Sequence, residues 1–390
     1  MRRFISIALS GICLVTAMLW GAEKNAGQNG RRPSYLVYVG TYTGPSSKGI
    51  YAYRFDAVAG KSTKLGVAAE TTNPSFLVIN PDRTRLYAVN EISNYENQNT
   101  GSISSFSIDR ETGKLTFLNK VSSGGAGPCY LALDRTAKYL LAANYDAGTA
   151  AVFPVMPDGR LGAASATVQH QGHGADPERQ ASPHPHWLGL SPDNRFAVAA
   201  DLGVDKVFIY RFDAAHGSLV PATPNFVSLP PGSGPRHFTF HPNGKFGYVV
   251  NEMGSTVTGF SYDAKNGALH EIQSISTLPE SFKGHNDTAE IQIHPNGKFL
   301  YASNRGHDSI AVFAVNSKNG ALKSIEYVSS GGKTPRTFEI DPSGSFLFAA
   351  NQRSDRVDIF RIDAKSGRLT PTGEVLDVPS PVCIKFVALP

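Results

Sequence analysis

Residues 232–252 read GSGPRHFTFHPNGKFGYVVNE. This stretch predicts a β-hairpin, because two runs of strand-forming residues flank HPNGK, and the Asn-Gly pair in that segment is typical of a tight turn. An antiparallel hairpin returns the chain to its starting end. Arg236, which opens the first strand, is therefore expected to lie close to Glu252, which closes the second.

This hairpin is one copy of a repeat that runs through the chain. Six copies begin at residues 74, 128, 185, 235, 288 and 335. Repeats of about 50 residues are typical of propellers and solenoids. Each hairpin is followed by a third strand, as in residues 308–322, and by a fourth, outer strand such as KSIEYVSSG. Four antiparallel strands per repeat predict the blade of a β-propeller.

The two ends of the repeat region complete one another. YLVYVGTYTG (35–44) continues as a second strand but lacks a first, whereas PSPVCIKFVAL (379–389) is a first strand with nothing after it. Pairing them would make a seventh blade and remove the open sheet edges. The sequence therefore predicts an all-β, seven-bladed propeller over residues 33–390, with four antiparallel strands per blade and a ring closed by its N- and C-terminal strands.

The first residues have a different composition. Arg2 and Arg3 precede an uncharged run from Phe4 to Ala22. This pattern predicts a signal peptide over residues 1–22, followed by a polar linker over residues 23–34. We expect an exported protein, periplasmic or secreted, without stable membrane association after cleavage. The alternative is an uncleaved membrane anchor, since about 19 apolar residues just span a bilayer.

Charge and cysteine content exclude several classes of function. The net charge is +5 at pH 7 and the charges are interspersed, which excludes a nucleic-acid partner. The chain has three cysteines, of which Cys129 and Cys383 fall in different predicted blades and are expected as buried thiols.

The irregular connection 170–186 carries four histidines. Its spacings match no metal motif, so a substrate-covering loop is favoured over a metal site, and no cofactor is expected.

Residues that break the repeat indicate where chemistry takes place. The starts of first strands and the ends of second strands share one face of a propeller, and several repeats place Arg, His, Asp or Glu there. Unpaired charge in a narrow channel is costly. Convergence of these groups therefore favours an anionic small-molecule substrate and acid–base chemistry over a purely structural ion-pair network. The candidates are His184, His186, Arg236, His237, Glu252, Glu290, Arg305, His307 and Arg336.

Several motifs resemble one known family. They are YVGTYT (38–43), PHPHW (183–187), GPRHFTFHPNGK (234–245) and SNRGHDSIAVF (303–313). Over nearly all of residues 33–390 the chain resembles the seven-bladed propeller lactonases, which include bacterial 6-phosphogluconolactonases and fungal carboxymuconate cyclases. The resemblance implies an enzyme, a lactonase that opens a sugar lactone. Because an exported copy would rarely meet a phosphorylated lactone, an unphosphorylated aldonolactone is also a candidate.

The resemblance also implies site residues. The set proposed for the cyclase branch corresponds here to His186 (or His184), Arg236, Glu252 and Arg305. We expect Glu252 or His186 to be the base that activates water, Arg236 to stabilise the oxyanion and Arg305 to bind the substrate's negative charge. The chain has no Gly-x-Ser-x-Gly motif, which favours a water nucleophile over an acyl-enzyme.

The catalytic set is thus expected to be His186, Arg236 and Glu252. The substrate-binding residues are expected to be His184, His237, Glu290, Arg305, His307 and Arg336, with His237 and Arg336 as second choices for the chemical steps. Two alternatives stay open at this point: a muconate-lactone cyclase-type enzyme, and a non-catalytic propeller that serves as a binding scaffold.

Overall fold

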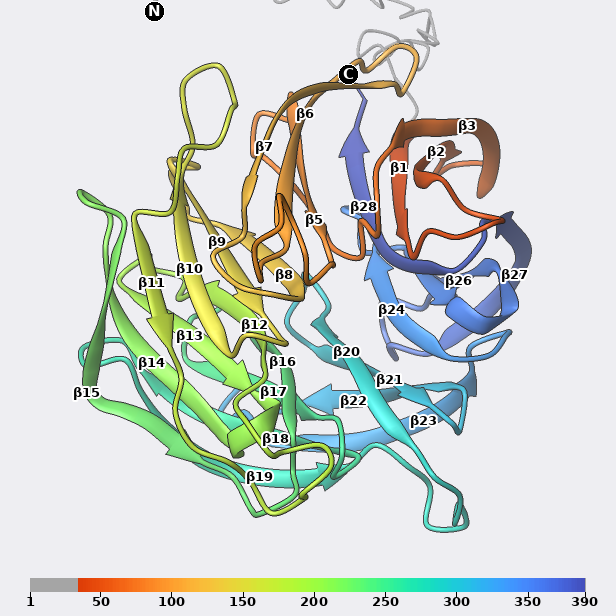
Figure 1. The fold of residues 1–390 in the computed structure, drawn as a ribbon. Helices are drawn as coiled ribbons and strands as arrows, with labels where there is room; N and C mark the ends of the chain where they lie inside the picture. The colour runs from red at the N-terminus through yellow and green to blue at the C-terminus, as the bar shows by residue number, and fades with distance from the viewer. Residues whose placement is uncertain (1–33, 390) are drawn as a thin grey trace, which may run out of the picture. The chain divides into compact units, whose positions relative to one another are not determined.

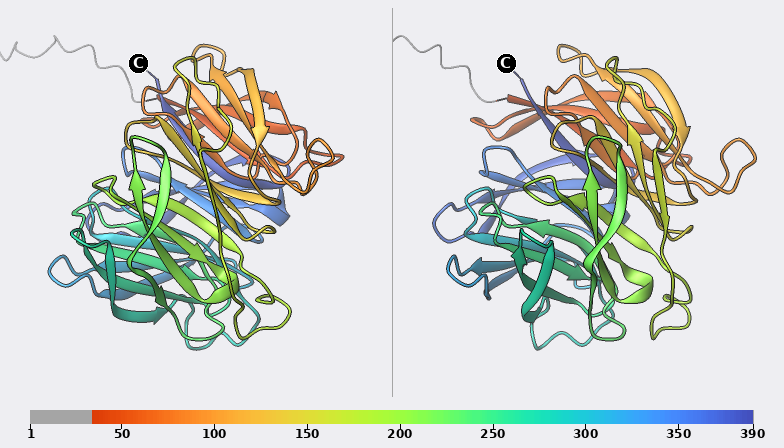
Figure 2. Two further views of the ribbon diagram at one scale, coloured as in Figure 1. Left: turned by 60° about the vertical axis from the view of Figure 1, so that its left-hand side comes forward. Right: turned by 90° about the vertical axis from the view of Figure 1, so that its left-hand side faces the viewer.

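The computed structural model describes residues 34–389, which form seven four-stranded antiparallel sheets around a common centre (Figure 1). The expected seven-bladed β-propeller is confirmed. Side views show the blades stacked around one ring, with loops projecting from both faces (Figure 2). The described residues hold only two short 3₁₀ helices, η1 (Leu202–Val204) and η2 (Gln352–Ser354), and none of their helices is long and apolar enough to cross a membrane.

The strands fall into four sets by their position within a blade. The innermost are β4 (Leu77–Ile79), β8 (Pro128–Leu133), β12 (Pro185–Leu190), β16 (Pro235–Phe240), β20 (Asp287–Ile293), β24 (Pro335–Ile340) and β28 (Pro381–Ala388). The second are β5 (Arg85–Asn90), β9 (Tyr139–Asn144), β13 (Phe196–Asp201), β17 (Phe246–Asn251), β21 (Phe299–Arg305), β25 (Phe346–Asn351) and β1 (Ser34–Thr41). The third are β6 (Ser102–Ile108), β10 (Thr149–Pro154), β14 (Lys206–Asp213), β18 (Thr256–Asp263), β22 (Ser309–Val315), β26 (Arg356–Ile362) and β2 (Gly49–Asp56). The outermost are β7 (Leu115–Ser122), β11 (Ala166–Gln169), β15 (Ser218–Ser228), β19 (Ala268–Ser276), β23 (Leu322–Ser329), β27 (Leu369–Asp377) and β3 (Lys61–Glu70).

The seventh blade is built from both ends of the propeller. β28 pairs with β1 in antiparallel register, with Tyr35 opposite Ala388 and Gly40 opposite Cys383, and Figure 1 shows the two strands side by side. The closure expected from the sequence is therefore confirmed. The predicted signal segment, residues 1–22, and the linker up to residue 33 lie outside the described residues.

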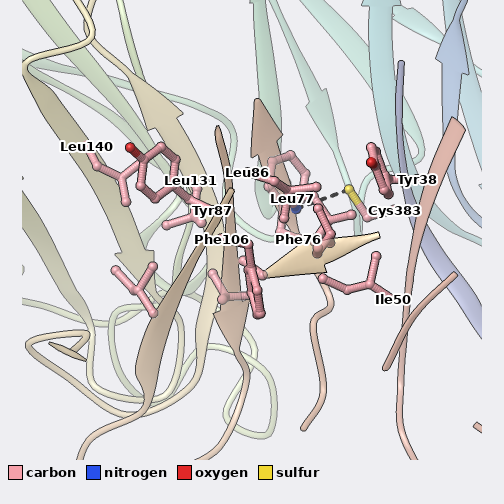
Figure 3. Packing of buried hydrophobic residues seen from close by; sticks show 14 of the residues in the cluster. Tyr38, Ile50, Phe76, Leu77, Leu86, Tyr87, Phe106, Leu131, Leu140 and Cys383 are labelled. Carbon is pink, nitrogen blue, oxygen red and sulfur yellow. Dashed lines mark hydrogen bonds between the residues drawn. The ribbon is translucent and has the colours of Figure 1, made fainter. Parts of the chain in front are cut away.

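Neighbouring blades pack through large apolar side chains. At the seam between the closing blade and the next one, Tyr38 of β1 packs in one cluster with Leu77 of β4 and Leu86 of β5 (Figure 3). Cys383 of β28 joins the same cluster, and its sulfur accepts a hydrogen bond from the Leu77 backbone at 3.3 Å. Both Cys129 and Cys383 are free, buried thiols, as expected. Burial of each large apolar side chain stabilises the fold by about 1.5–3 kcal/mol.

The turns on the face opposite the candidate site have a structural role. His241 Nε2 lies 2.9 Å from the backbone oxygen of Gly297, and His294 Nε2 lies 2.8 Å from that of Gly344. Each histidine thus links its own turn to the corresponding turn of the next blade. These contacts give the two histidines a structural role.

Candidate active site

A β-bulge near the start of the innermost strand recurs around the ring. The pairing passes from Pro185 to Trp187 in β12, from Pro235 to His237 in β16, and shifts similarly in four other blades. A bulge inserts one residue that is left out of the ladder and is turned to a new direction. The residues left out are Cys129, His186, Arg236, Ala289, Glu290, Arg336 and Val382.

All but one of these bulged residues line a single pocket at the centre of the ring. The pocket is lined by Ser75, Phe76, Glu91, Cys129, His186, Arg236, His237, Glu290, Arg336, Thr337 and Val382. Its free space is about 10 Å³, which is about the room that one water molecule needs. The bulges therefore convert a ring of repeated strands into a polar pocket.

Glu252 is held by three arginines beside this pocket. Its Oε2 lies 2.9 Å from Arg236 Nε and 2.8 Å from Arg305 Nη2, and its Oε1 lies 2.5 Å from Arg179 Nη2. The closeness of Arg236 and Glu252 agrees with the hairpin prediction. Arg236 also donates a hydrogen bond through Nη1 to the backbone oxygen of Ala289 at 2.7 Å. Both carboxylate oxygens of Glu252 are thus occupied by cations.

These cations decide the protonation state of Glu252. Burial by itself raises the pKa of this carboxyl, but Arg305, Arg236 and Arg179 lower it more, so that it falls from 4.5 to about 2. A carboxylate with so low a pKa is a weak proton acceptor at neutral pH. The expectation that Glu252 is the base stays a prediction, and its ion pairs favour a role in holding the guanidinium groups in place.

His237 and Glu290 form a buried dyad on the other side of the pocket. His237 Nδ1 lies 3.1 Å from Glu290 Oε1, and Thr337 Oγ1 donates to Glu290 Oε2 at 3.0 Å. His237 Nε2 is buried and has no hydrogen-bond partner among the described residues. Burial lowers the pKa of His237 to about 4, with Arg236 acting in the same direction and Glu290 against it. At neutral pH the imidazole is therefore uncharged.

His186 packs against His237 in the lining of the pocket. The two ring centres lie 5.1 Å apart, and the ring of Tyr145 packs against His186 at 5.5 Å. His186 Nδ1 is also buried without a hydrogen-bond partner among residues 34–389. Burial, followed by the positive charge of Arg236, lowers the pKa of His186 well below 6.5. Two neutral imidazoles thus present free ring nitrogens in one small polar space.

The third side of the pocket holds Arg336 and Glu91. The guanidinium of Arg336 lies over the ring of Tyr42, 5.3 Å from its centre. The Tyr42 hydroxyl donates to both carboxylate oxygens of Glu91 at 3.0 Å, and Ser75 donates to Glu91 as well. A negative group that already accepts several hydrogen bonds is thus placed near the positive charge of Arg336.

Two predicted substrate-binding residues make their contacts elsewhere. The ring of His184 stacks on Tyr145 at 4.4 Å, and its Nδ1 lies 2.9 Å from the Tyr145 backbone oxygen. His307 Nδ1 lies 2.7 Å from Ser309 Oγ, and its ring packs against Phe282. Neither histidine lines the central pocket. No group of three or more His, Cys, Asp or Glu side chains in residues 34–389 is arranged to hold a metal ion.

Comparison with known proteins places this geometry in a family. Residues 36–386 match the family described as Lactonase, 7-bladed beta-propeller. The chain belongs to this family. It is 38% identical over 353 residues to the 6-phosphogluconolactonase of Bacillus subtilis (strain 168), covering 90% of this chain and 98% of that protein. It is also 35% identical over 309 residues to the 6-phosphogluconolactonase of Formosa agariphila, covering 77% of this chain and 85% of that protein.

One solved structure that is similar to this chain is that of the periplasmic gluconolactonase of Pseudomonas aeruginosa. It is similar to this chain with a TM-score of 0.85 at 37% sequence identity, and the match covers 92% of this chain and 100% of that one. The likeness therefore extends over the whole propeller, including the strands that carry the pocket.

Two charged site residues of this lactonase were missed in the sequence. Glu91 follows Asn90 as Glu252 follows Asn251, so its position in the repeat was a usable signal. Arg179 lies in the irregular loop 170–186, where no strand pattern indicates a direction. Its contact with Glu252 is visible only in the folded chain.

Proposed function

We propose that this protein is a hydrolase that opens a sugar lactone with a water molecule activated in the central pocket. One observation carries the proposal: His186 Nδ1 and His237 Nε2 are buried, have no hydrogen-bond partner among the described residues, and belong to a pocket with room for about one water that Arg236 also lines. A buried polar atom without a partner is costly unless a ligand or water satisfies it. Membership of the lactonase family supports the same chemistry.

His237 is the proposed base. When neutral and hydrogen-bonded from Nδ1–H to Glu290, it presents the lone pair of Nε2 to the pocket. It takes a proton from water while the hydroxide oxygen bonds to the lactone carbonyl carbon. It then returns that proton to the ring oxygen as the C–O bond breaks, so one imidazole serves as base and then acid. His186 holds the water from the other side.

Arg236 is the proposed oxyanion donor. Burial, with the charges of Arg305 and Arg336, lowers its pKa to about 10, so the group stays charged at neutral pH. Its Nη1 donates to the Ala289 backbone oxygen and the group is ion-paired with Glu252, which holds the guanidinium in place. Such preorganised donors stabilise a developing negative charge without having to reorient.

The body of the substrate is proposed to bind at the mouth of the pocket, because a sugar ring needs more room than one water. Arg236 and Arg336 line the pocket and Arg305 contacts Glu252 beside it, which supports an anionic substrate. His184 stacks on Tyr145, whose ring packs against His186 of the pocket, whereas His307 contacts Ser309 and Phe282. We therefore propose substrate contact for His184 and leave His307 with a structural role in its loop.

We also propose that the protein is exported, with residues 1–22 as signal peptide, residues 23–34 as linker and residues 33–390 as the lactonase domain. The charged start followed by an apolar run supports export, and a periplasmic relative has the same fold. A fusion of residues 1–35 to a reporter that is active only in the periplasm tests this. Retention of the fusion in the cytoplasm would contradict it.

The experiment for the function is a pH-stat assay of the purified protein with a panel of plain and phosphorylated sugar lactones. We expect hydrolysis of at least one lactone, and a loss of kcat of about 10²-fold or more in His237→Asn. The matched control is His294→Asn, since His294 is as deeply buried but contacts only the opposite face. If the wild type hydrolyses no lactone, the binding-scaffold alternative replaces this proposal.

A further inference from the structure

On the basis of the proposed function, we infer that Arg179 determines specificity. Its guanidinium binds an oxyanion of the ligand at the pocket mouth. The oxyanion is either a phosphate on the substrate or the carboxylate that ring opening produces. Three independent features of the structure lead to this inference: the anchoring of the loop, the charge of the Glu252 cluster, and the exposure of Arg179 relative to its neighbours.

The loop that carries Arg179 is fixed at both of its sides. At its start, His170 is buried, with Nδ1 2.6 Å from Asp201 and Nε2 2.9 Å from the Tyr210 hydroxyl. Next to Arg179, the fully buried Gln180 donates to Asp205 Oδ1 and to the Leu202 backbone oxygen, each at 2.8 Å. Such buried hydrogen bonds hold the backbone at one place over the pocket.

The loop is also bonded within itself around Arg179. The Asp176 carboxylate accepts hydrogen bonds from the backbone of Glu178 and of Arg179, both at 2.9 Å. The Gln180 side-chain oxygen accepts from the backbone of Ala175 and Asp176. Arg179 is therefore presented from a preorganised turn, and a preorganised group loses little conformational entropy when it binds a ligand.

The charge around Glu252 is unbalanced. Three guanidiniums surround Glu252, and the further carboxylate near Arg179 is Asp287, whose Oδ1 lies 3.9 Å from Arg179 Nη1. Within this ion-paired group three guanidiniums thus share two carboxylates. An excess positive charge in a cleft attracts an anion, and the planar guanidinium fork suits the two oxygens of a carboxylate or a phosphate.

Arg179 is the member of the cluster that a ligand can reach. Its side chain is 39% exposed, compared with 2% for Arg236 and 14% for Arg305. Arg236 also donates to a backbone oxygen of the neighbouring blade, and Arg305 to one of its own blade, whereas Arg179 makes its side-chain ion pairs at the open end of the cluster. An entering anion therefore meets Arg179 first.

The test compares Arg179→Gln and Arg179→Lys with the wild type on glucono-δ-lactone, on its 6-phosphate, and with gluconate as inhibitor. The matched control is Arg353→Gln, an exposed arginine at the same face that has no side-chain contact with Glu252. We expect Arg179→Gln to raise KM for the phosphorylated lactone, or the inhibition constant of gluconate, about tenfold or more. KM for the plain lactone should rise less than this, and Arg179→Lys should recover part of the loss.

Three results would overturn the inference. One is an effect of Arg179→Gln no larger than that of Arg353→Gln. Another is an equal change of KM for plain and phosphorylated lactone while the inhibition constant of gluconate is unchanged. The third is a fall in kcat with KM kept for both, which would mean that Arg179 acts only through Glu252. If the wild type hydrolyses no lactone, the proposed function fails separately. Calorimetric binding of inorganic phosphate and gluconate then decides: tenfold weaker binding by Arg179→Gln supports the inference, and equal or absent binding overturns it.

Discussion

Glu252→Gln separates two roles for the carboxylate that the sequence singled out as a base. The substitution keeps the shape of the side chain and removes its charge. Because Arg236 and Arg305 both contact Oε2 and Arg179 contacts Oε1, the variant leaves buried guanidinium groups without their counter-charge. Removal of one partner from a buried ion pair is strongly destabilising.

The size of the expected loss of stability follows from the pKa of Glu252. The fall from 4.5 to about 2 corresponds to about 3 kcal/mol of stability that the charged form contributes. Because the pKa is lower in the folded state than in the unfolded state, this contribution is fully present above pH 4.5. It is lost as the pH falls from about 4.5 towards 2.

The assay is equilibrium urea unfolding of wild type and Glu252→Gln between pH 7 and pH 3. We expect the variant to be less stable by about 3 kcal/mol at pH 7, and the difference to shrink below about pH 4.5. The matched control is Glu70→Gln, which removes an exposed pair with Lys48 and should cost less than about 1 kcal/mol. A variant that loses activity but keeps wild-type stability would refute the reasoning and restore Glu252 as the base.

Three further predictions concern closure, oxyanion binding and pH. Truncation after Pro379 removes β28 and should abolish cooperative thermal unfolding measured by circular dichroism, since it opens an inner edge of the ring; an unchanged melting temperature would contradict the closure. Arg236→Ala should lower kcat about 10²-fold, while the control His241→Ala, on the opposite face, should keep kcat near the wild-type value. Equal effects of the two substitutions would place the site elsewhere. Because His237 has a pKa of about 4 and must be neutral to accept a proton, kcat/KM should fall only as the pH drops through about 4, whereas a limb near 6.5 would argue against it as base.

The repeat in the sequence determined the architecture of this protein. Each copy contains its own turn signal and its own pair of strand-forming runs, so the blades could be counted from local patterns alone. The in-register placement of the ends, with YLVYVGTYTG lacking a first strand and PSPVCIKFVAL lacking a second, also predicted the pairing of β1 with β28. The closeness of Arg236 and Glu252 followed from hairpin geometry.

Only the tertiary structure decided what these residues can do. The alternation of side chains along a strand assigns each residue to a face only while the pairing is regular. The bulges that leave out His186 and Arg236 break this regularity, and no sequence pattern marks them. The state of Glu252 depends on three arginines from different parts of the chain, among them Arg179 from a loop without periodicity. Charges that meet through long-range closure set the pKa of a buried group, and no local pattern in the sequence records their distance.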